Sequence, residues 1–397
     1  MNNNTLGAQR AFAPKAIGLK LALTAAAAVA VAGGFSPAVA AEQTGISNRS
    51  IGYVLTTRTY GIYQAMDATG KETNAECPKG LYDFGPREQF AAMFPQTEGK
   101  KWTLAETTVA REANVWFPKA GADKFPIQEI EGKISYGVNL DGKVKPTDFT
   151  SPDGKPGVDN QLYRAVGCIP SYRLGSSQVL FETQYFESRT YNRTIIELTE
   201  VDSLENDDDV TITTYRGLDA LVRDAKGDFQ VDTTQRIDTV YGQDFIHTFK
   251  GKIVDGVLTT TKSGDFVWPT QHQHQEAATE WMRDTHFELK LTPEKVEGAI
   301  AGYLDIESHY RGVNRRFGSH QISYGKLTSE SFYKALRRLA DAYPDPETGA
   351  NTAISGTLMI TGVRARIVHP EKQVAGTNGA PRRDGLTGDR VSITGAH

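Results

Sequence analysis

The chain has 397 residues, of which 39% are hydrophobic and 9% aromatic, and its formal net charge is −4 at pH 7. This hydrophobic content is sufficient for a packed core, and the length accommodates one large domain or two smaller ones. A mildly acidic chain lacks the basic surface that attracts phosphate backbones, so the composition argues against nucleic acid as a partner.

The first 40 residues have the layout of a secretory signal peptide. Three basic residues, Arg10, Lys15 and Lys20, precede an apolar run over 21–35, and small residues end the segment at Ala40. Cleavage there would leave a net charge of −7, because the three removed charges are all positive. The apolar run is shorter than the roughly 20 residues of a spanning helix. We therefore expect a periplasmic or secreted protein without a transmembrane anchor.

Cys77 and Cys168 are the two cysteines of the chain. In an oxidising compartment an even pair favours a disulfide. Two buried free thiols and metal ligation remain alternatives, although no Cys-x-x-Cys spacing supports a zinc site.

Alternating apolar and polar residues predict strands through much of the chain. In Phe287-Glu288-Leu289-Lys290-Leu291 the apolar side chains share one face and the charged ones the other. Similar β-branched and aromatic runs cover residues 51–60, 178–186, 191–200, 210–215, 244–254, 257–262 and 353–368. We predict a mainly β fold, an antiparallel sandwich or barrel-like body, spanning residues 41–372.

Helices are expected to be few and short. A proline followed by good helix formers predicts one over residues 86–94. A second is predicted over residues 329–342, where apolar residues recur at spacings of four and three, and Tyr343-Pro344 ends it. A division into two subdomains would fall between residues 150 and 210, and residues 373–397 have the composition of a flexible tail.

A glycine-rich loop at residues 153–160 carries closely spaced oxygen ligands. Asp153, Asp159 and Asn160 are the side chains that a calcium ion would take, as a structural cofactor. The loop lacks the ligand spacing of an EF-hand. A surface turn in which Asp and Asn bind nearby backbone donors is the alternative.

A His-x-His pair lies between two predicted strands. On an extended strand His272 and His274 would share a face, and with Glu276 they could bind zinc, copper or iron. A third histidine would come from a distant strand. The candidates for it are His247, His286, His309 and His320.

Aromatic side chains surround the histidine pair in the sequence. Trp268 and Trp281 flank it, and Tyr303 and Arg311 follow further along the chain. Ring faces next to polar tips suit a carbohydrate or an aromatic ligand. The same residues could equally fill the core and rim of a β fold.

Three further stretches, at residues 76–81, 157–161 and 339–346, resemble an uncharacterised group of exported proteins of Gram-negative bacteria. The resemblance implies an envelope location and a paired role for Cys77 and Cys168, and it implies no activity. The chain carries no nucleophile elbow, no phosphate-binding loop and no dinucleotide fingerprint. Whether it is an enzyme stays open at this point.

We therefore expect an exported β-rich protein that binds a small ligand or an envelope protein. A metal-dependent hydrolase or oxidoreductase built on the His-x-His pair is the first alternative. The second is a structural component of an envelope assembly that joins its partners by strand addition.

Overall fold

The computed structural model describes residues 45–69, 71–72, 76–77, 97–99, 128–174, 187, 193–240, 242–270, 278–310 and 329–370. The predicted signal peptide, the helix at 86–94, the strand at 178–186 and the tail at 373–397 lie outside them. The predicted subdomain boundary is left untested.

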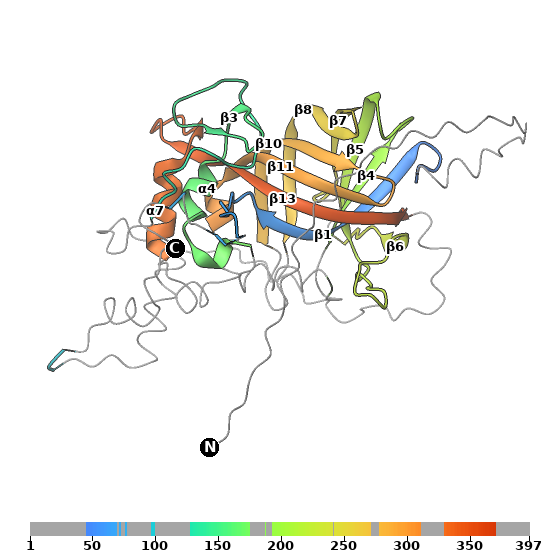
Figure 1. The fold of residues 1–397 in the computed structure, drawn as a ribbon, viewed down its shortest axis with the longest axis horizontal. Coiled ribbons are helices and arrows are strands. Elements are labelled where there is room, and N and C mark those ends of the chain that lie inside the picture. Colours follow the sequence, from blue (N-terminus) through green and yellow to red (C-terminus); the bar gives the residue numbers. More distant parts are fainter. Residues whose placement is uncertain are drawn as a thin grey trace, which may run out of the picture.

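The fold is mainly β, and its body is an eight-stranded antiparallel barrel (Figure 1). The strands follow one another around the barrel in the order β1, β4, β5, β7, β8, β10, β11 and β13, and β13 pairs with β1 to close it. Their bounds are β1 Ser50–Tyr60, β4 Arg193–Thr199, β5 Asp207–Gly217, β7 His247–Val254, β8 Val257–Lys262, β10 Ala278–Leu291, β11 Lys295–Asp305 and β13 Asn351–Val368. The sequence left open a sandwich or a barrel, and the β1–β13 pairing decides for the barrel.

Shorter strands and helices are added to this body. The strands are β2 Phe149–Thr150, β3 Pro156–Val158, β6 Thr233–Arg236, β9 Gly264–Thr270 and β12 Ala342–Pro344. The helices are α4 Gln161–Val166, the 3-10 helix η1 Pro170–Tyr172 and α7 Ser329–Leu339. Helices α4 and α7 lie together at one end of the barrel, next to the β2–β3 hairpin (Figure 1). The predicted second helix is thus confirmed, but it ends at Leu339 rather than at residue 342, and Ala342–Pro344 form a strand on β13.

The alternation in sequence explains which side chains form the core. Phe287, Leu289 and Leu291 of β10 are buried, whereas Glu288 and Lys290 between them face outward. Strand β7 alternates in the same way, and its buried residues are Phe249, Gly251 and Ile253. Burial of each large apolar side chain contributes roughly 1.5–3 kcal/mol. The barrel interior is therefore the main hydrophobic core.

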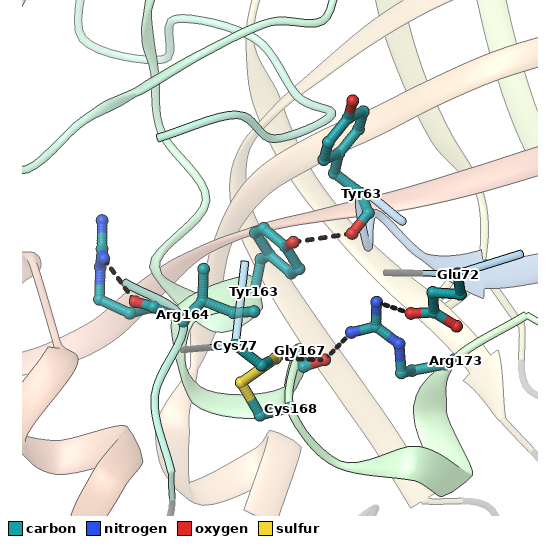
Figure 2. Close-up of a disulfide and its surroundings, with 9 residues drawn as sticks. Tyr63, Glu72, Cys77, Tyr163, Arg164, Gly167, Cys168 and Arg173 are labelled. Atoms are coloured by element: carbon teal, nitrogen blue, oxygen red, sulfur yellow. Dashed lines mark hydrogen bonds and ion pairs between the residues drawn. A yellow bond between two sulfur atoms is a disulfide. The ribbon is translucent and has the colours of Figure 1, made fainter. Parts of the chain in front are cut away.

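Helix α4 is held against the barrel by its first residues. The side chain of Asn160 caps the helix by accepting a hydrogen bond from Tyr163 N (3.3 Å). Its amide group donates to Gly61 O (3.1 Å) and Ser135 Oγ (2.9 Å). Cys168 lies two residues after the end of this helix. It forms the predicted disulfide with Cys77 (Figure 2). The two sulfur atoms are bonded to each other, so the alternative of free thiols is excluded.

Candidate ligand-binding site

A trough crosses the outer face of the barrel. It consists of two adjoining cavities of about 380 and 580 Å³. Both are lined by Glu288 of β10, Gly298 of β11 and Met359 of β13, so they meet over these three strands. Each volume lies in the range typical of small-molecule sites. We call the smaller cavity the charged lobe and the larger one the apolar lobe.

The floor where the lobes meet depends on a glycine. Gly298 lies opposite Leu289 and Ile360 in the neighbouring strands, and its φ angle is +151°. A Cβ atom there would lie 2.2 Å from the carbonyl oxygen of Glu288. Only a residue without a side chain fits this close approach of two backbones.

Replacing Gly298 with alanine is expected to lower the free energy of unfolding by about 2 kcal/mol, because the added methyl group must displace backbone and adopt a positive φ. Urea unfolding measures the loss. The matched control is Gly227→Ala, since Gly227 also has a positive φ (+89°) but has open space at its Cβ position. An equal loss in the two variants would show that φ alone, and not the contact with β10, constrains Gly298.

The β2–β3 hairpin forms the outer wall of the charged lobe. Its turn needs Gly154, whose φ is +90°, and Gly154 N donates to Ser151 O (2.9 Å). The hydroxyl of Ser151 accepts from Lys155 N (2.9 Å) and donates to Asp153. These local bonds fix Asp153 and Lys155 at the rim of the lobe.

Three charges face one another across the charged lobe. Lys155 Nζ lies 3.1 Å from an oxygen of Asp153 and 4.0 Å from an oxygen of Glu288. The hydrogen bond from the Ser151 hydroxyl, and then that from Lys155, lower the pKa of the Asp153 carboxyl. The pKa of Lys155 is raised, first by the hydrogen bond that Lys155 donates to Asp153 and then by the charge of Glu288. With two carboxylates and one ammonium group, this lobe favours a neutral or cationic partner.

The apolar lobe is lined mainly by hydrocarbon and hydroxyl groups. Its apolar residues are Leu174, Val257, Met359 and Ile360. The hydroxyls come from Thr57 and Thr59 of β1 and Thr361 of β13, and Thr57 Oγ1 lies 2.6 Å from Thr361 Oγ1. Lys290 and Glu297 complete the lining. This lobe suits an apolar body that carries few polar groups.

The residues of the predicted calcium loop have different surroundings. Asp153 is at the exposed rim, whereas Asp159 and Asn160 are each 1% exposed. Asp159 accepts from Leu140 N (2.8 Å), and Asn160 is the helix cap described above. Within the described residues, no group of three or more His, Cys, Asp or Glu side chains is arranged to hold a metal ion. Calcium binding stays a prediction.

Burial raises the pKa of Asp159 from its ordinary value of 3.8 to about 6, and the nearby Asp141 and Asp148 carboxylates add to this rise. Since the folded state binds its proton more tightly than the unfolded state, this group adds stability as the pH falls from about 6 to about 4. Above pH 6 the buried charge is a cost. Asp159→Asn is therefore expected to stabilise the protein by about 1–3 kcal/mol at pH 8 and not at pH 4.

Urea unfolding of this variant across pH 4–8 measures that difference. The carbonyl oxygen of the substituted amide side chain can still accept from Leu140 N, so the bond itself is retained. Asp208→Asn, at an exposed position on β5, is the control and should leave the pH dependence unchanged. The same pH dependence in Asp159→Asn and the wild-type protein would contradict the raised pKa.

The predicted aromatic site is divided between the two faces of the barrel wall. Trp268 is 1% exposed and lies in the interior, where Arg58 stacks on its ring at 5.2 Å. Trp281 is 42% exposed and packs against Arg283 on the outside. Tyr303 shares that outer face, because its backbone pairs with Arg283.

The other predicted site residues, Arg311, His272, His274 and Glu276, lie outside the described residues. The metal site built on the His-x-His pair therefore stays a prediction. Of the histidines considered as a third ligand, His309 lies in the barrel interior and is fully buried.

The trough could not be predicted from the sequence. By its pattern Glu288 belongs to a solvent-facing stripe, and Met359 and Thr361 belong to a predicted strand. One signal was available, because Gly298 interrupts a run that otherwise reads as a strand, and such a glycine marks a bulge or a close backbone approach. Its partners could not be named without the register.

Comparisons with known proteins found no matching family model, no matching curated protein and no matching solved structure. Function is therefore inferred from the geometry of this chain. Among the helices that the structure describes, none is long and apolar enough to cross a membrane.

Proposed function

We propose that the protein is exported and binds a small elongated ligand in the trough. The observation that carries the proposal is the adjacency of two cavities of ligand size with different linings. An apolar body would lie over Met359 and the threonines, and a polar end would meet Asp153, Lys155 and Glu288. The signal-peptide layout of the sequence supports export.

The charges of the smaller lobe favour one end group over another. Its two carboxylates outnumber its single ammonium group, so an amine or a sugar is expected to bind better than a carboxylate. Octylamine, octyl glucoside and octanoate carry similar alkyl chains and differ mainly in this end group. Isothermal titration of the mature protein with the three is expected to rank octanoate last.

Two substitutions test whether such binding occurs in the trough. Met359→Trp fills the place where the lobes meet and is expected to weaken binding of all three compounds at least tenfold. Thr248→Trp adds the same ring at an exposed position on β7 and is the control. Loss of binding in both variants, or in neither, would contradict the assignment to the trough.

A charge substitution tests the orientation of the ligand. Glu288→Gln is expected to weaken octylamine about fivefold and to strengthen octanoate, because one carboxylate leaves the charged lobe. Glu205→Gln, in an exposed loop, should change neither. If Glu288→Gln binds each of the three compounds with the same affinity as the wild-type protein, the polar end of the ligand does not lie at Glu288.

A further inference from the structure

The strand register shows which residues lie at the two ends of the trough. One row of outward-facing residues crosses its four strands, and these residues are Glu288, Ala299, Met359 and Thr59. The next row on the same face contains Thr361 of β13 and its partner Thr57 of β1. From strand spacing and rise, the backbone at Glu288 lies roughly 12 Å from that at Thr361 and roughly 16 Å from that at Thr57. A ligand that starts in the charged lobe and follows the apolar lobe therefore ends at these threonines.

A β-bulge in β1 brings three hydroxyl groups together at that end. The register of β1 on β13 shifts between Leu55 and Thr57, so Thr56 is an extra residue of β1 without a partner of its own. Thr361 Oγ1 lies 2.9 Å from Thr56 Oγ1 and 2.6 Å from Thr57 Oγ1. Bulges re-aim side chains in this way and are frequent next to active sites. The bulge thus adds a third hydroxyl to what would otherwise be one cross-strand pair.

A count of protons shows what this hydroxyl cluster offers to a ligand. The three hydroxyls carry three protons, and the two contacts between them use two. Among the described residues, these oxygens form no other hydrogen bond. One proton is therefore left over, whichever way the hydroxyls are turned. Thr57 and Thr361 line the cavity, so a ligand oxygen selects the arrangement in which one of these two hydroxyls donates to it.

The charged residues at this end of the apolar lobe leave the choice of end group to the hydroxyls. Lys290 and Glu297 line the lobe in the same row as the threonines, and they are direct cross-strand partners. Their opposite charges offset each other, so this end carries no net charge. A charged end group gains no net attraction here, whereas a neutral oxygen gains a hydrogen bond from the free proton.

We infer that the ligand of the trough has a polar group at both ends of its apolar chain, and that the second is a neutral oxygen that accepts a hydrogen bond from Thr57 or Thr361. A hydroxyl, an ether and a carbonyl group share this chemistry. The inference rests on the proposed function, because it assigns the other end of the same ligand. Thr361 is exposed to solvent in the free protein, so a ligand that ends in a methyl group displaces water from the hydroxyls without replacing its hydrogen bond.

Two amines of equal length test the second polar end. Nonylamine and 8-amino-1-octanol have the same number of non-hydrogen atoms, and they differ in a methyl or a hydroxyl group at the far end. An extended chain advances about 1.2 Å per bond, so the amino alcohol spans roughly 11 Å and reaches both ends of the trough through a hydrogen bond at each. Isothermal titration of the mature protein is expected to show about fivefold tighter binding of the amino alcohol. A lobe without the free proton would reverse the order, because an unpaired hydroxyl is costly to bury.

Paired substitutions test whether the threonines make this contact. Thr57→Val/Thr361→Val removes both hydroxyls that line the cavity and nearly keeps the size of the side chains. This variant is expected to bind nonylamine at least as tightly as the wild-type protein and the amino alcohol at least tenfold more weakly. Thr213→Val/Thr248→Val is the matched control, because it removes a cross-strand pair of threonine hydroxyls (3.5 Å) on β5 and β7, outside the trough. The control should change neither affinity.

The outcomes separate this inference from the proposed function. If the wild-type protein binds the amino alcohol no more tightly than nonylamine, while Met359→Trp weakens nonylamine, the inference is overturned and the trough remains a binding site. If the wild-type protein binds neither amine, the inference is overturned, and the titration with octyl glucoside decides on the trough separately. Equal weakening of the amino alcohol in the two threonine double variants would also overturn it. The wild-type titrations are decisive even if Thr57→Val/Thr361→Val does not fold.

Discussion

Reduction of the Cys77–Cys168 disulfide is expected to lower the free energy of unfolding by about 4–5 kcal/mol. The two cysteines are 91 residues apart in the sequence, and in the chain-entropy account a cross-link over a loop of that length restricts the unfolded chain by this amount. The bond also ties the segment that contains Cys77 to the end of α4 (Figure 2). Its loss should therefore affect the global unfolding transition.

The bond lies within other contacts that fix the same region. Arg173 donates to Gly167 O and pairs with Glu72, and the hydroxyl of Tyr163 donates to Tyr63 O (2.8 Å) (Figure 2). These contacts survive reduction, so the reduced protein is expected to fold with a lower stability. Tyr163→Phe removes one hydrogen bond and should cost only about 1 kcal/mol.

Urea unfolding of the oxidised protein, the reduced protein and the Cys77→Ala/Cys168→Ala variant measures the effect. The last two should agree, and adding reductant to the double variant should change nothing. The dependence of the free energy on urea should steepen without the cross-link, because a freer unfolded chain exposes more surface. A loss below about 1 kcal/mol would show that the chain-entropy term is not the main contribution here.

Local patterns in the sequence predicted most of the barrel strands. Alternation is a property of neighbouring residues. That Phe287 points into the core and Glu288 away from it can be predicted without knowing which strands lie beside them. Closure of the barrel is different in kind. It rests on β1 pairing with β13, near the other end of the chain, and no local pattern encodes that contact.

The positions of the site residues show the same limit. Trp268 and Trp281 looked equivalent in the sequence, but the register of β9 on β10 pairs Trp268 with Glu280 and Trp281 with Val267. Because adjacent residues point to opposite faces, one tryptophan lies inside and the other outside. The sequence marks Asn160 as a candidate calcium ligand or turn residue, and its role as the cap of α4 is visible only in the structure. These roles depend on tertiary contacts.

Substituting Glu280 alone is the second change for which a large effect is expected. Glu280→Leu would leave the Arg58 guanidinium buried without this carboxylate and His309 Nδ1 without its acceptor. Removing one partner of a buried ion pair typically costs about 3–5 kcal/mol, and we expect a loss of about that size in urea unfolding at pH 7. Asp202→Asn, which breaks the exposed pair with Arg49 (2.8 Å), should cost less than about 1 kcal/mol.

The double variant Arg58→Met/Glu280→Leu shows what the pair contributes. If the ion pair were kept for stability, the double variant would lose at least as much as either single one. We expect it instead to recover most of the loss, because two apolar side chains of similar size avoid the cost of burying charge. Recovery of stability in the double variant would mean that the ion pair itself adds no net stability to the barrel interior. A double variant as unstable as Glu280→Leu would mean that the charged side chains stabilise the interior in a way that apolar side chains of similar size cannot replace.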